Sequence, residues 1–163
     1  MRADNQAEPR AAGDGGPRQR CSFKVLGRRF RRQVSPKAIK SLKERIREKT
    51  GRTLGRRLDV IIQDLRKYLV GWKGNLGSAE VRSVFKELDS WIRRRLRCYL
   101  WKQWGRRGYR ELRRRGVSRD LAWSTAKSAH GPWRLSRSPA LAFALPGKYF
   151  RALGLPQLSE KPT

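Results

Sequence analysis

The sequence has little of the chemistry that metal centres and disulfide frameworks need. It contains two cysteines, Cys21 and Cys98, and one histidine, His130, among 163 residues. Two cysteines cannot build a disulfide framework, and with one histidine they cannot complete a four-ligand Cys/His zinc site. We therefore expect no metal and no other cofactor.

Long apolar runs are also missing. No stretch approaches the roughly 18 consecutive apolar residues of a membrane-spanning helix, and the N-terminus has no apolar segment of the kind found in secretory signals. The sequence therefore predicts no membrane association and a cytoplasmic location.

Catalytic patterns are absent too. The sequence has no GxxxxGK[ST] phosphate loop, and no pair of carboxylates lies in an apolar setting suited to acid–base or metal chemistry. His130 has no Ser, Cys or carboxylate at a suggestive spacing, so a loop or packing role is favoured for it. We expect the chain not to be an enzyme on its own and identify no catalytic residues.

Positive charge is what the sequence has in excess. Lys and Arg number 41 against 13 Asp and Glu, a formal net charge of +28. Residues 21–57 carry +12 and residues 91–115 carry +10, whereas residues 58–90 are neutral. A surplus of this size calls for a polyanion such as nucleic acid. Codon bias toward arginine is the plain alternative, but it does not explain a neutral segment between two basic ones.

The first 33 residues divide into two segments. Residues 1–20 are rich in Ala, Gly, Arg and Pro without an apolar period, which predicts a disordered leader. Residues 21–33 predict a short strand or hairpin interrupted at Gly27. Because an isolated hairpin is only marginally stable in water, this one needs a partner surface.

Helical periodicity dominates the middle of the chain. Ser35 and Pro36 form a helix start, with the Ser35 side chain as the cap, and the helix is expected to stop near Thr50 and Gly51. A second apolar face recurs from Leu58 to Trp72, and a third helix is predicted from Ser78 to Trp104. The fold class is therefore mostly α, a helical bundle with a short N-terminal β-hairpin.

Residues 108–158 predict a basic, irregular helical extension. Short helical candidates span residues 109–115, 118–128 and 138–145, separated by turns at residues 131–134 and 153–156. Residues 159–163 form a tail.

Aromatic residues are interleaved with the second basic block. Cations contact phosphates by charge, and exposed tryptophans stack on unpaired bases. Core packing is favoured for Trp91, while Trp101 and Trp104 are left open between core and stacking roles. The predominance of arginine favours RNA over duplex DNA.

Several segments resemble group II intron reverse transcriptases of bacteria. Residues 23–30 (FKVLGRRF) are similar to the element that follows the polymerase palm, and residues 34–40 (VSPKAIK) to the start of the thumb, or maturase-specific, domain. Residues 69–74 (LVGWKG) resemble the Gly-Trp turn of that domain, and residues 88–97 (LDSWIRRRLR) resemble its arginine helix. Residues 131–141 (GPWRLSRSPAL) resemble the end of such proteins, so the likeness runs from about residue 21 to 158.

Two departures from the family pattern matter. Asn75 and Leu76 stand where the family has Tyr-Phe, and no YxDD motif of a polymerase palm occurs. The resemblance therefore implies an orphan palm-type hairpin at 21–33, a helical maturase (thumb) domain at 34–107 and the extension at 108–158, without the polymerase. It implies a bacterial RNA-binding protein that holds structured intron RNA and assists splicing.

The sequence leaves two alternatives open. In the first, the chain is a fragment of a reverse transcriptase that works only with a separately encoded palm. In the second, it is a general nucleic-acid-binding protein with RNA or a DNA target as partner. The residues predicted to bind RNA form two surfaces with two tryptophans: Arg28, Arg29, Arg31, Arg32, Lys37, Lys40 and Lys43, then Arg93, Arg94, Arg97, Trp101, Lys102, Trp104, Arg106 and Arg107.

Overall fold

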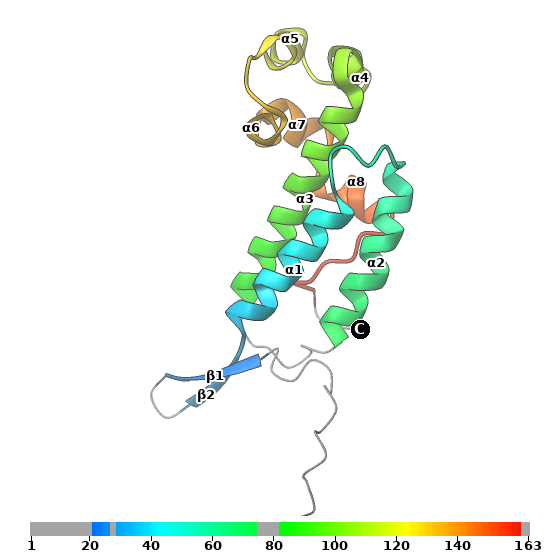
Figure 1. Ribbon diagram of the computed structural model, residues 1–163. Coiled ribbons are helices and arrows are strands. Elements are labelled where there is room, and N and C mark those ends of the chain that lie inside the picture. Colours follow the sequence, from blue (N-terminus) through cyan, green and yellow to red (C-terminus); the bar gives the residue numbers. More distant parts are fainter. Residues whose placement is uncertain (1–20, 27–28, 75–81, 161–163) are drawn as a thin grey trace, which may run out of the picture.

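The structure, a computed structural model, describes residues 21–26, 29–74 and 82–160 (Figure 1). The predicted leader at 1–20, Arg28, the Asn75–Leu76 departure and residues 161–163 of the tail lie outside these ranges. The backbone of residues 29–33 is described, but their side chains are not.

The mostly α prediction is confirmed. Within the described ranges, three longer helices precede a set of short ones. The longer helices are α1 (Pro36–Lys49), α2 (Leu58–Gly74) and α3 (Arg82–Trp104). A 3-10 turn, η1 (Gly105–Arg107), leads from α3 into the short helices. These are α4 (Gly108–Arg114), α5 (Arg119–Lys127), α6 (Pro132–Leu135), α7 (Pro139–Ala144) and α8 (Gly147–Ala152).

Two strands precede the helices. β1 (Cys21–Leu26) pairs antiparallel with β2 (Arg29–Val34), with Cys21 opposite Val34 and Leu26 opposite Arg29. Figure 1 shows this pair projecting from the beginning of α1, away from the helices.

The start of α1 differs from its prediction in one detail. Pro36 occupies the first turn and Ser35 has extended backbone angles, as expected of an N-cap. The Ser35 side chain, however, makes no capping hydrogen bond. The helix start therefore rests on backbone geometry and on Pro36, whose fixed φ suits the first turn and which has no amide hydrogen to satisfy.

The core lies between the three longer helices and continues under the short ones. Leu42 and Ile46 of α1 face Ile62, Leu65 and their neighbours on α2, and the stripe of Leu88, Ile92, Leu96 and Tyr99 on α3 completes the layer. Leu112, Leu141 and Phe150 of the short helices belong to the same buried cluster. Side chains from both sides of residue 107 thus share one core, and the boundary proposed there stays a prediction.

The C-terminal segment is fastened back onto the long helices. Buried Asp89 on α3 accepts hydrogen bonds from the backbone amides of Leu158 (2.9 Å) and Ser159 (3.0 Å), and from the Ser159 hydroxyl (2.8 Å). Lys73 of α2 donates to the Gln157 carbonyl at 3.1 Å. A carboxylate that accepts three bonds is well satisfied, so this contact fixes the end of the described chain against α3.

Three parts of the extension differ from the prediction. The turn predicted at residues 131–134 is replaced by α6, which spans residues 132–135, and α8 was not predicted. The helix predicted at 118–128 is present as α5, one residue shorter at each end. None of the helices in the described ranges is long and apolar enough to cross a membrane.

Candidate nucleic-acid interface

Trp91 marks the place where the two predicted basic surfaces meet. This half-buried side chain on α3 packs beside the core, and two cations of α1 approach its ring. The Lys43 Nζ lies 5.9 Å from the ring centroid and the Arg47 Cζ lies 5.7 Å from it. The indole face attracts such cations, so α1 and α3 present their positive charge on one shared face.

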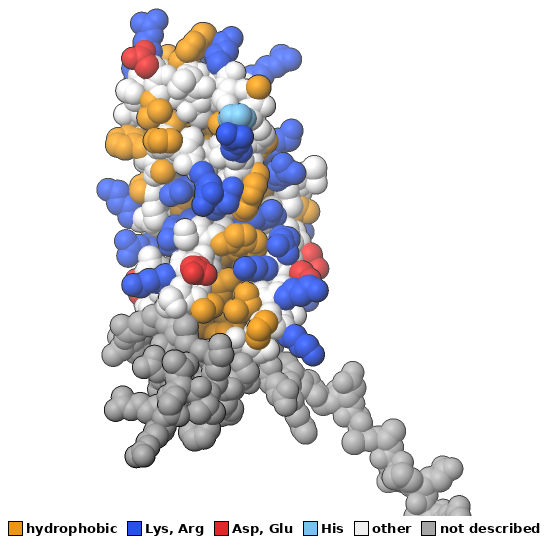
Figure 2. Space-filling view, turned by 90° about the vertical axis from the view of Figure 1, so that its left-hand side faces the viewer, with side chains coloured by type: hydrophobic (Ala, Val, Ile, Leu, Met, Phe, Trp, Pro, Cys, Tyr) orange, Lys and Arg blue, Asp and Glu red, His pale blue; other side chains and the backbone are white. Residues whose placement is uncertain are grey.

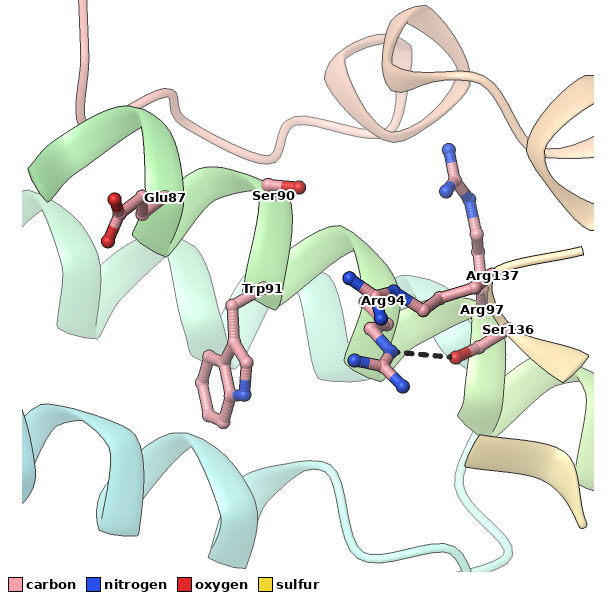
Figure 3. Close-up of a pocket in the computed structure, with 7 residues that line it drawn as sticks. All are labelled: Glu87, Ser90, Trp91, Arg94, Arg97, Ser136 and Arg137. Carbon is pink, nitrogen blue, oxygen red and sulfur yellow. Dashed lines mark hydrogen bonds between the residues drawn. The ribbon is translucent and has the colours of Figure 1, made fainter. Parts of the chain in front are cut away.

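A groove of about 450 Å³ begins at Trp91 and runs along α3 (Figure 3). Its far wall comes from the turn between α6 and α7. The lining residues are Glu87, Ser90, Trp91, Arg94, Arg97, Ser136 and Arg137. Three guanidinium groups against one carboxylate make the groove strongly electropositive.

Arg94 is held in place from two directions. Its Nε donates to the Ser136 hydroxyl at 3.3 Å and a terminal nitrogen donates to the Trp133 carbonyl at 3.2 Å. Its Cζ also lies 3.8 Å from the centroid of the Trp133 ring, the spacing of a stacked guanidinium. Ser136 in turn donates to the Trp133 carbonyl at 2.6 Å. The groove wall is therefore fixed by hydrogen bonds before any ligand arrives.

Arg97 is fixed in a comparable way. Its Nε donates at 3.0 Å to the carbonyl of Leu145, the residue that caps the C-terminus of α7. A cation at that end of a helix is favoured by the exposed carbonyls. Arg93 lies on the next turn, with its Cδ against the start of α8 at Gly147.

Like charges crowd this face. Burial, followed by repulsion from Arg137, lowers the pKa of the Arg94 guanidinium. Burial, followed by repulsion from Arg93, lowers the pKa of Arg97. Because the fold holds these cations together against their repulsion, an anion placed between them relieves an unfavourable interaction.

The neighbouring Arg95 serves the fold instead. Its Nε donates to the Thr50 hydroxyl at 3.2 Å, and a terminal nitrogen donates to the carbonyls of Arg47 (3.4 Å) and Thr50 (3.3 Å). These contacts cap the C-terminus of α1. The sequence alone indicates this structural role, because Arg95 falls on the apolar stripe between Ile92 and Tyr99.

The remaining predicted residues are dispersed. Lys37 and Lys40 are exposed on α1, the latter beside Lys43 and Arg47 along a second, smaller hollow. Lys102, Arg106 and Arg107 are exposed at the other end of α3 and do not line the groove. Figure 2 shows Lys and Arg side chains distributed around a strip of hydrophobic ones on one face, with few acids among them. The contact roles predicted for Arg29, Arg31 and Arg32 stay predictions.

Trp101 and Trp104 pack against the core. Their rings meet edge to face at 6.1 Å, and the Trp101 ring lies over Gly108, where an added Cβ would approach it to 2.8 Å. This packing favours a structural role for Trp101 over base stacking.

Sequence reasoning missed Arg47, Ser136 and Arg137 as members of this face. Arg47 follows Lys40 and Lys43 at helical spacing, so its place was readable from the periodicity. Ser136 and Arg137 approach α3 across about forty residues of sequence, and only tertiary packing brings them there. In the described part of the chain no three His, Cys, Asp or Glu side chains cluster as metal ligands.

The residues that form one wall of the groove belong to a segment that matches a known family. Residues 39–117, from the first turn of α1 to the third residue after α4, match the family model described as "Group II intron, maturase-specific domain". This segment is a group II intron maturase-specific domain. No curated protein matches the chain in a sequence search. The maturase domain contributes Trp91, Arg94 and Arg97 to the groove, while Ser136 and Arg137 come from the segment that follows it.

Proposed function

We propose that this chain binds structured group II intron RNA and assists its splicing through the groove at Trp91. The observation that carries the proposal is the convergence of Arg94, Arg97 and Arg137 beside a half-buried tryptophan, on a maturase domain. A guanidinium group has the planar fork that matches two phosphate oxygens, and its charge persists at all physiological pH values.

The role follows from how the groove is built. Arg94 and Arg97 are already oriented by the Trp133 and Leu145 carbonyls, so RNA binding costs little side-chain ordering. A preformed surface of this kind binds best the RNA conformer whose phosphates match it. Binding then shifts the RNA population toward that conformer, and the RNA itself performs the chemistry of splicing. In this proposal the chain is not an enzyme on its own.

Gel-shift competition tests the proposal. Labelled intron RNA is bound by the full chain and challenged with unlabelled intron RNA, tRNA or duplex DNA at two salt concentrations. If ~6 to 10 phosphates are contacted, affinity for intron RNA falls by about 10³ to 10⁵ between 50 and 200 mM salt. Intron RNA is expected to compete better than tRNA or duplex DNA. Equal competition by all three, or an affinity insensitive to salt, would refute a specific maturase role.

The hairpin favours a second candidate, docking to a separately encoded reverse transcriptase palm. Among the described residues, β1 and β2 form a two-stranded sheet that projects from α1, and such a sheet is marginal without a covering surface. The DNA upstream of the gene tests this candidate directly. A palm reading frame nearby, whose product copurifies with this chain, supports it. Copurification that survives deletion of residues 21–33 would contradict docking through the hairpin.

A further inference from the structure

A further hollow lies at the C-terminal helices, separate from the groove at Trp91 and from the hollow beside Lys40. It has a volume of about 790 Å³. Its wall is mostly apolar and includes two cations but no carboxylate. The lining residues are Arg115, Ala142, Phe143, Ala144, Pro146, Lys148, Tyr149 and Ala152. All of them except Arg115 come from α7, α8 and the turn between these helices.

Arg115 is held in this hollow by aromatic rings. Its Cζ lies 5.2 Å from the centroid of Trp104 and 4.8 Å from that of Tyr149. Its Nε is buried and has no hydrogen-bond partner within the described part of the chain. The neighbouring Arg114, by contrast, pairs with Glu111 at 3.4 Å. The charge of Arg115 is therefore positioned by ring faces, and no acid in residues 29–74 or 82–160 forms an ion pair with it.

Phe143 supplies an exposed aromatic surface beside this cation. The side chain is 63% exposed, although it stands in α7 next to buried Ala144 and two residues from buried Leu141. Its ring lies 3.7 Å from the place of a Cβ on Gly116, which adopts φ +82° in the turn after Arg115. The aromatic face, Arg115 and Lys148 thus border one opening.

We propose that this hollow binds a single unpaired nucleotide of RNA, with its base stacked on Phe143 and its phosphate placed between Arg115 and Lys148. Stacking on an aromatic side chain is available to every base, and the flanking cations suit the phosphate that each nucleotide carries. The site rests on the RNA-binding function proposed above and adds to it the preference for unpaired over paired nucleotides.

Charge distinguishes this occupant from a second copy of the chain. The lining carries two cations and no carboxylate, and the chain itself has a net charge of +28. Two copies brought together at this opening would repel each other, whereas an RNA strand is attracted.

The test measures binding of a fluorescein-labelled ten-residue oligouridylate to the full-length chain by anisotropy. Phe143→Ala is expected to weaken binding about tenfold, within the range measured for loss of one base–aromatic stack. Phe143→Tyr keeps the ring and is expected to bind within about twofold of the unchanged protein. Val70→Ala is the matched control, since Val70 is an exposed apolar residue on α2 outside the hollow, and it should leave binding unchanged.

Lys148→Ala tests the phosphate contact. It is expected to reduce the slope of log affinity against log salt by about 0.7 for a single strand. Lys67→Ala, an exposed lysine on α2, removes the same charge elsewhere and should leave that slope unchanged.

The outcomes separate this site from the proposed function. Wild-type protein that binds intron RNA while Phe143→Ala binds the oligouridylate equally well would overturn the nucleotide site alone. Wild-type protein that binds neither RNA would overturn both. A dimer in sedimentation that Phe143→Ala converts to monomer would show that a second copy covers the hollow, and would also overturn the site.

Discussion

The middle of α3 and the region where α3 runs into η1 carry the same kind of charge but hold it differently. In the groove, Arg94 and Arg97 are hydrogen-bonded to carbonyls of α6 and α7 and are partly withdrawn from water. Where α3 runs into η1, Lys102, Arg106 and Arg107 are exposed and have no ion pair within the described residues. The number of cations is similar, so the two regions differ in how firmly the fold fixes each cationic side chain.

The two regions therefore differ in what their cations can do: fixed side chains can select a ligand by shape, whereas exposed ones attract any polyanion. A guanidinium fixed by the fold presents its remaining donors in one arrangement and so discriminates between ligand shapes. An exposed lysine or arginine adds attraction and on-rate for any polyanion but selects little. Under the proposed function, we therefore expect the groove to give specificity for folded RNA, and Lys102, Arg106 and Arg107 to give general attraction.

Removing three cations from the groove and three from the region around η1 should give the largest difference in RNA binding. We expect the variant Arg94→Ala, Arg97→Ala, Arg137→Ala, which empties the groove of its cations, to bind intron RNA on the order of 100-fold more weakly, at about 1 kcal/mol for each lost contact. The matched variant Lys102→Ala, Arg106→Ala, Arg107→Ala should lose less than tenfold. Filter binding with intron RNA and tRNA measures both. Equal losses in the two variants would contradict the assignment of specificity to the groove.

Arg95 lies between Arg94 and Arg97 in the sequence but is expected to matter for folding. Arg95→Ala removes the donors to Thr50 and Arg47 and should lower the free energy of unfolding by about 2 kcal/mol, because bonds from a charged group, two of them to buried Thr50, are lost. Urea denaturation followed by circular dichroism measures this. Arg106→Ala, an exposed arginine in η1, is the control and should change stability by less than about 0.5 kcal/mol. If the two variants unfold at the same urea concentration, the capping role of Arg95 is wrong.

Gly108 tests how tightly η1 and α4 close over Trp101. A Cβ there would approach the Trp101 ring to 2.8 Å, so Gly108→Ala should destabilise the protein by about 1 to 2 kcal/mol through overpacking. Gly131→Ala is the matched control, because Gly131 has extended backbone angles and open space around its Cα. Thermal unfolding compares the two, and a Gly108→Ala protein as stable as the control would show that Trp101 moves freely.

The smallest expected effect is on stability in alkali. Burial raises the pKa of the Cys98 thiol on α3 above its ordinary value of 9.0. Because the folded state disfavours the thiolate, keeping Cys98 protonated contributes to the free energy of unfolding. That contribution is fully present below pH 9 and declines as pH rises through the folded pKa. Urea unfolding at pH 8 and pH 10 should show a decline that is smaller in Cys98→Ala. A decline of equal size in both proteins would assign the alkaline sensitivity to other groups, such as the Tyr99 hydroxyl, whose pKa burial also raises.

The residue pattern was sufficient to predict the three longer helices and the interior stripe of α3. Leu88, Ile92 and Leu96 repeat at helical spacing, and hydrophobic burial depends on little else. The helix of residues 132–135 was not predictable in the same way, because it is a single turn that begins at Pro132 and is fixed by contacts with Arg94.

The groove was only half predictable. A run of arginines in one helix predicts charge, but rotation of about 100° per residue sends Arg94 and Arg95 to different neighbours. Which of them lines the groove and which caps α1 depends on where α6 and the end of α1 lie. Arg137 joins the groove for the same reason, through tertiary packing that periodicity does not encode.

Crosslinking tests the central claim most directly. Intron RNA bound to the full chain is irradiated with ultraviolet light, digested, and the crosslinked peptides are identified by mass spectrometry. The account predicts crosslinks at Trp91 and in the segment around Ser136 and Arg137, weakened by excess intron RNA and little affected by tRNA. Crosslinks confined to Arg106, Arg107 and their neighbours, with none along the groove, would contradict it.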